Sequence, residues 1–88
     1  MTMDPQEQRE DCRREVRRFL AERAQLAFRD NTIHQKLRIE HGFTLNDVRD
    51  ALVFLVSDKQ AEPEPSELGA TLFYKITAYG TRSYERSR

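Results

Sequence analysis

The sequence predicts a mainly α protein with one small β-hairpin: a three-helix bundle, a two-stranded hairpin and a short C-terminal helix. Helix-capping signals precede stretches of apolar residues at helical spacing as far as about residue 58. A run of β-formers, T-L-F-Y-K-I at residues 71–76, follows a proline-containing segment. Because 88 residues leave no room for a second core, we expect one domain over residues 1–88.

The first helix is expected over residues 5–28. Asp4 is a good N-cap and Pro5 suits the first helical position. Arg23 falls inside the apolar stripe of this helix, where we expect it to extend toward solvent or to meet a carboxylate from another element. The stripe comprises Cys12, Val16, Phe19, Leu20 and Ala27.

The second helix is expected over residues 33–41. Thr32 and Gln35 have the spacing of a capping box, which predicts a start at Ile33. Gly42 stands where a left-handed residue ends a helix.

The third helix, over residues 45–58, has the clearest start signal. Thr44 is the predicted N-cap, and Phe43 and Val48 have the spacing of a hydrophobic staple. One broad arc is apolar and predicts the buried side: Leu45, Val48, Ala51, Leu52, Leu55 and Val56. The opposite arc predicts the exposed side: Asn46, Asp47, Asp50, Phe54 and Ser57. Phe54 is either exposed as a contact residue or packed under the hairpin or the first helix.

A β-hairpin is expected over residues 59–77. Pro63 and Pro65 restrict the first strand to an edge or loop. Thr77 is placed to cap a final helix over residues 78–86.

The charges balance both overall and locally. The chain has fifteen basic and fifteen acidic residues, and neither end is a basic arm or an acidic tail. Cys12 is the single cysteine, so no intramolecular disulfide can form. The N-terminus is polar, and no apolar run has the length of a membrane span. We therefore expect a cytoplasmic protein with no membrane partner.

No pattern of catalytic or metal-binding residues stands out. His34 and His41 lie seven residues apart, which is not the spacing of zinc ligands. The three glycines are isolated, so no phosphate-binding loop is present. We expect a non-enzymatic protein without metal or small-molecule cofactor.

Two segments carry a resemblance to a known superfamily. The segment F-T-L-N-D-V-R-D-A-L-V-F-L-V (residues 43–56) resembles the recognition helix of winged-helix proteins. The segment Y-K-I-T-A-Y-G (residues 74–80) is similar to the exit from the wing strand in MarR-like and PadR-like regulators. The resemblance spans about residues 12–86 and implies a winged-helix fold.

The resemblance implies DNA binding and transcription regulation. The third helix would enter the major groove, and the hairpin tip, residues 63–69, would be the wing. Base-facing positions would be Asn46, Asp47, Arg49 and Asp50. Further phosphate contacts would come from Lys36, Arg38, Lys59 and Arg82.

A protein partner, including a second copy of the chain, is the alternative. The wing carries Glu62, Glu64 and Glu67 and no cation, which disfavours a phosphate backbone. Val53 and Phe54 stand where relatives of this fold expose polar residues, and an exposed Phe favours protein contact. The sequence leaves both partners open.

Overall fold

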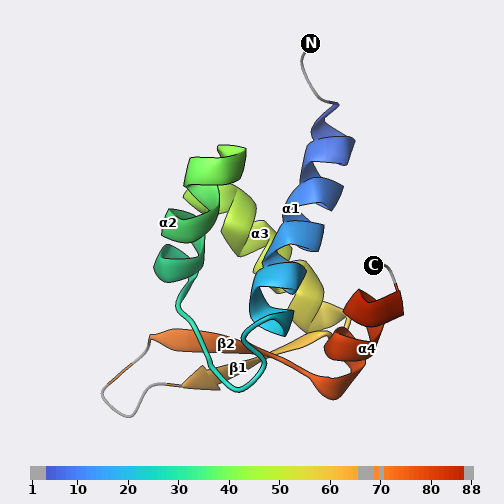
Figure 1. Ribbon diagram of the computed structural model, residues 1–88. Helices are drawn as coiled ribbons and strands as arrows, with labels where there is room; N and C mark the ends of the chain where they lie inside the picture. Colours follow the sequence, from blue (N-terminus) through green and yellow to red (C-terminus); the bar gives the residue numbers. More distant parts are fainter. Residues whose placement is uncertain (1–3, 66–68, 70, 87–88) are drawn as a thin grey trace.

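The computed structural model describes residues 4–65, 69 and 71–86 (Figure 1). The elements, in chain order, are α1 (Pro5–Ala21), α2 (Asp30–His41), α3 (Leu45–Ser57), β1 (Ala61–Pro65), β2 (Leu72–Ile76) and α4 (Ala78–Arg86). This order confirms the predicted class of three helices, a two-stranded hairpin and a C-terminal helix.

The three long helices stand above the hairpin, and α4 lies on the far side of the molecule from α2 (Figure 1). Their buried sides meet in one core. The largest fully buried side chains of this core are Leu20, Ile33, Leu52, Leu55, Val16, Val48 and Cys12. The core therefore fixes the relative positions of α1, α2 and α3.

The hairpin is antiparallel, with Ala61 opposite Ile76 at its base and Pro65 opposite Leu72 toward its tip. Pro63 and Pro65 both lie in β1. An edge strand tolerates proline because its outer N–H groups need no partner. Phe28 pairs with Tyr74 of β2 through two backbone hydrogen bonds of 2.9 and 2.8 Å. The segment after α1 thus covers the second edge of β2.

The first helix ends at Ala21, seven residues before the predicted end at residue 28. Residues 22–25 form a turn, in which the Leu26 N–H donates to the Arg23 carbonyl at 2.9 Å. This turn places Phe28 beside β2. The Phe28 ring lies edge-on to the Phe19 ring, with 5.0 Å between the two ring centroids. Pairing with the hairpin and burial of an aromatic ring outweigh the helix propensity of this segment.

The second helix begins at Asp30, three residues before the predicted start, and Thr32 lies inside it. Its N-cap is Arg29, which makes no side-chain capping bond. Instead, the Asp30 carboxylate accepts the Asn31 N–H at 2.7 Å. An acidic residue in the first turn also suits the positive end of the helix dipole, so the helix starts earlier than the Thr32 pattern indicates.

The third helix begins as predicted. The Asp47 N–H donates to Thr44 Oγ1 at 3.1 Å, and the Thr44 N–H donates to Asp47 Oδ2 at 2.9 Å. Gly42, before this cap, has a φ of 71° and ends α2 in the predicted left-handed conformation. Among the described residues no helix has the length and apolarity needed to cross a membrane.

Candidate functional site

The exposed side of α3 is the surface that the sequence predicted to bind a partner. Asn46 and Asp50 are exposed, and Val53 has 66% of its surface exposed. Asp47 is only half-buried but is engaged in the capping box, and Gln8 of α1 donates to the same carboxylate at 3.5 Å. Of the predicted reading residues, Asp47 is thus held by the protein itself.

Arg49 is engaged too. Its Nε donates to Asp30 Oδ2 at 2.8 Å, which links α3 to the first residue of α2. Partial burial alone would raise the pKa of Asp30, but the hydrogen bonds from Arg49 and the Asn31 N–H, with the charges of Arg49 and Arg29, lower it below its usual value. Asp30 therefore stays ionised and holds Arg49 through its Nε atom, while the Arg49 side chain remains 54% exposed.

Phe54 is partly exposed, at 37% of its surface. The guanidinium of Arg13 lies 3.9 Å from the centroid of its ring. A cation over an aromatic face is a favourable contact, so α1 covers one face of Phe54. The sequence left open whether Phe54 is exposed or packed under another element. Phe54 lies at the surface, where it contacts the first helix.

An apolar groove separates α3 from the hairpin. Its volume is about 190 Å³, and Leu72 beside it has 43% of its surface exposed. The lining residues are Val53, Val56, Ser57, Pro63, Leu72 and Tyr74. This corner is where a wing and a recognition helix would hold DNA between them, yet none of the residues that line it is a cation.

The hairpin carries the acidic residues on its other face. Lys75 Nζ lies 3.9 Å from Glu62 and 3.3 Å from Glu64, so β2 supplies a cation that balances part of the acidic charge of β1. Glu67 lies outside the described residues, as do residues 66 and 68 of the predicted wing tip.

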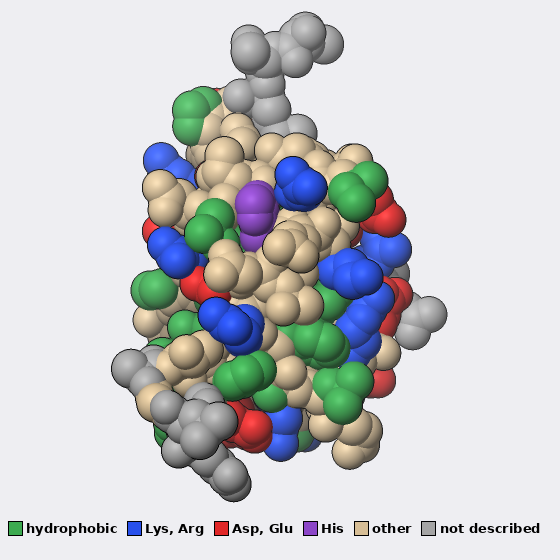
Figure 2. Space-filling model, turned by 90° about the vertical axis from the view of Figure 1, so that its left-hand side faces the viewer, with side chains coloured by type: hydrophobic (Ala, Val, Ile, Leu, Met, Phe, Trp, Pro, Cys, Tyr) green, Lys and Arg blue, Asp and Glu red, His purple; other side chains and the backbone are tan. Residues whose placement is uncertain are grey.

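The four predicted phosphate contacts fall into two separate groups. Lys36 and Arg38 lie on α2, while Arg82 lies on α4, on the far side of the molecule (Figure 1). Lys59 adjoins the start of α4, because its carbonyl accepts the Thr77 hydroxyl at 2.7 Å. All four side chains are exposed and form no ion pair with a described residue. Figure 2 shows the side on which α2 lies, with Lys and Arg side chains spread over it around a histidine.

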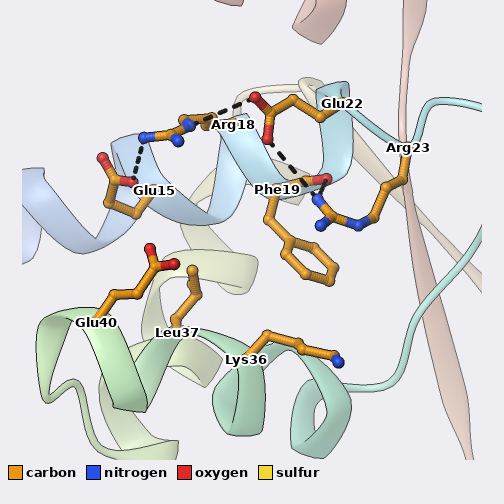
Figure 3. Close-up of a pocket in the computed structure, with 8 residues that line it drawn as sticks. All are labelled: Glu15, Arg18, Phe19, Glu22, Arg23, Lys36, Leu37 and Glu40. Carbon is orange, nitrogen blue, oxygen red and sulfur yellow. Dashed lines mark hydrogen bonds and ion pairs between the residues drawn. The ribbon is translucent and has the colours of Figure 1, made fainter.

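A polar hollow of about 200 Å³ lies between α1 and α2 (Figure 3). Glu15, which is 9% exposed, is the centre of its ion pairs, with Arg18 at 3.3 Å and His41 at 3.3 Å. Arg23 is exposed and lies 4.0 Å from the centroid of the Phe19 ring; the carboxylate near it, at 3.8 Å, belongs to its neighbour Glu22 and not to another element. The ammonium of Lys36 extends away from Glu15. Of these contacts only that between Glu15 and His41 joins α1 to α2, and none of them involves Lys36.

Metal ligation and thiol chemistry are the two kinds of site that can be checked directly in the described residues. No group of three His, Cys, Asp or Glu side chains in residues 4–65, 69 and 71–86 could hold a metal ion. Cys12 is buried, and burial, followed by the charges of Asp47, Asp11 and Asp50, raises the pKa of its thiol to about 12. A thiol with this pKa is a poor nucleophile near neutral pH.

Comparison with solved structures gives the fold. No protein-family profile matches the chain, and no curated protein matches it by sequence. A transcriptional regulator from Clostridium thermocellum, Cth-833, superposes with a TM-score of 0.77 at 16% identity, over 98% of this chain and 84% of that one. The chain has a winged-helix fold.

Structures of a second protein also superpose on the chain. A mutant of ZitR from Lactococcus lactis superposes with a TM-score of 0.71 at 14% identity, over 88% of this chain. Another ZitR mutant gives a TM-score of 0.65 at 14% identity, over 83% of this chain. The chain spans about half the length of these ZitR chains, 49% and 48%. At such identities the similarity establishes the winged-helix arrangement and not the residues of a site.

Proposed function

We propose that this winged-helix chain is a non-enzymatic module that binds duplex DNA. The proposal is supported by the similarity to a transcriptional regulator over 98% of the chain. The observation that carries it lies on α2, where Lys36 and Arg38 are exposed and pair with no described carboxylate. Phosphate contacts from such cations supply most of the affinity in non-specific DNA binding.

Of the two acidic residues of α2, Asp30 is paired with a permanent cation. Asp30 accepts the guanidinium of Arg49 at 2.8 Å, and the Glu40 carboxylate lies 3.6 Å from the His41 imidazole. The local field on α2 is therefore more positive than the zero net charge of the chain indicates.

The test is a titration of labelled random-sequence duplex with the protein, followed by fluorescence anisotropy over a series of salt concentrations. Two phosphate contacts predict a slope of log K against log salt of about −1.8, and each further contact adds about −0.9. Absence of association at the lowest salt concentration would contradict the proposal.

A second candidate function is protein binding or dimerisation through the apolar groove. The exposure of Val53 and Leu72, at 66% and 43%, favours it, because apolar corners of this kind are typical of protein contact. Analytical ultracentrifugation tests the dimer. Self-association that persists at high salt and is lost in Val53→Asp supports it, with Ile39→Asp, at a position 81% exposed on α2, as the matched control.

A further inference from the structure

The outer side of α2 is mainly polar, also carries Ile39, which is 81% exposed, and has no partner among the described residues. Asn31, Gln35 and Arg38 recur at the spacing i, i+4, i+7 and are all exposed. The inner side of the same helix is fixed by Ile33 and Leu37, which are buried in the core. Core packing thus turns two amides and a guanidinium toward solvent.

Two further cations flank this stripe. Lys36 lies on the edge next to α1, where it lines the hollow of Figure 3 with its ammonium directed away from Glu15. Arg29 is exposed immediately before the helix. Of the two acidic residues of α2, Asp30 is paired with Arg49, while Glu40 is exposed and lies 3.6 Å from His41, which is charged only when protonated. Amides, guanidinium and ammonium are the donors that proteins direct at phosphate oxygens.

The exposed side of α3 offers a poorer surface for the same ligand. The Nε atom of its one guanidinium, Arg49, donates to Asp30, which offsets part of its charge, and the carboxylate of Asp50 would repel phosphate. Val53, 66% exposed, can contact a thymine methyl group but donates no hydrogen bond. The outer side of α2 therefore has more available hydrogen-bond donors and more positive charge than the exposed side of α3.

We propose that the outer side of α2, and not the exposed side of α3, is the surface that contacts duplex DNA in this winged-helix chain. This inference rests on the proposed function. Lys36 and Arg38 contact phosphates, and the amides of Asn31 and Gln35 donate to neighbouring phosphate oxygens. The stripe from Asn31 to Arg38 is about 10 Å long at 1.5 Å per residue, which is long enough to follow a short stretch of backbone.

Two double variants of equal charge test the proposal. Lys36→Ala with Arg38→Ala removes two positive charges from α2, and Lys59→Ala with Arg82→Ala removes two from the base of the hairpin and α4. Anisotropy with a random duplex is expected to show a loss of at least about tenfold in affinity, and a salt slope shallower by about 2, for the α2 pair. The control pair is expected to change affinity less than about twofold, because only the surrounding field is altered.

Three results would overturn the inference. Equal losses for the two pairs would mean that general charge and not α2 governs binding. Unchanged affinity of the α2 pair, together with loss in an Asn46→Ala, Val53→Ala variant, would place the contact on α3. A wild-type chain that binds no duplex at low salt would remove the proposed function as well. All substituted positions are exposed, and circular dichroism checks the fold; Lys36→Gln with Arg38→Gln replaces a pair that fails to fold.

Discussion

The Nε atom of Arg49 lies 2.8 Å from Asp30 Oδ2, so one hydrogen-bonded ion pair joins α3 to the first residue of α2. The pair engages Nε of the only arginine of α3 and offsets part of its charge, while the side chain stays 54% exposed. It also neutralises part of the charge of Asp30, the residue at which α2 begins. The same contact therefore lowers the positive charge that α3 presents and contributes to the surface of α2.

Asp30→Asn should destabilise the fold slightly near neutral pH. The folded pKa of Asp30 is lowered, so its contribution is present above its usual value of 3.8 and is lost as the pH falls through the folded value. Because the pair is exposed in part, we expect a loss of about 0.5 kcal/mol near pH 7 that disappears near pH 2. Urea unfolding at the two pH values measures it. Asp50→Asn, which breaks no ion pair within the described residues, is the control, and an equal loss there would contradict the prediction.

Arg13 and Phe54 should be coupled energetically. The guanidinium lies 3.9 Å from the ring centroid on a surface that is partly covered, and such contacts contribute about 0.5–1 kcal/mol. A double-mutant cycle with Arg13→Ala and Phe54→Ala measures the coupling by urea unfolding. Strictly additive effects would show that the two side chains do not interact in solution.

Gly80→Ala should destabilise the fold strongly. A Cβ at this position would lie 2.1 Å from the Gln60 carbonyl oxygen and 2.8 Å from Ile76 Cδ1. The backbone of the turn before β1 would have to move, which costs about 1–3 kcal/mol or more. Gly42→Ala is the comparison, since nothing lies within 4 Å there and only its φ of 71° is unfavourable, at about 1–2 kcal/mol. If thermal unfolding shows a larger loss of stability for Gly42→Ala than for Gly80→Ala, the result would contradict the packing of α4 on the hairpin.

Cys12 should resist alkylation while the protein is folded. The side chain is 1% exposed, and burial raises its thiol pKa to about 12, so both access and thiolate are lacking near pH 8. Mass spectrometry after iodoacetamide treatment is expected to find modification in urea and almost none without it. Equal rates in the two conditions would mean that Cys12 is outside the core.

The sequence predicted the elements whose signals are local. Thr44 and Asp47 specify the start of α3 through side chains three residues apart, and Gly42 ends α2 through its own φ. The end of α1 depends on Phe28 pairing with Tyr74, 46 residues further along. The start of α2 depends on Asp30 and on Arg49 of another helix. Neither of these long-range contacts can be recognised from the residues that are adjacent in the sequence.

The candidate surface was predictable in composition but not in arrangement. The sequence identified Lys36, Arg38, Lys59 and Arg82 as cations, and only the fold separates them into two groups on α2 and at the base of the hairpin (Figure 1). The polar stripe of α2 was present in the sequence as the spacing of Asn31, Gln35 and Arg38. An estimate of which side of α2 is buried, from Ile33 and Leu37, would have found it.

The most direct measurement of DNA contact is an NMR titration of the ¹⁵N-labelled chain with a short random-sequence duplex at low salt. The largest shifts are expected for backbone amides of residues 31–38 and for the side-chain NH₂ signals of Asn31 and Gln35, with smaller shifts over residues 46–53. Shifts confined to residues 46–53 and to β2, or a spectrum unchanged by the duplex, would contradict binding of DNA through α2.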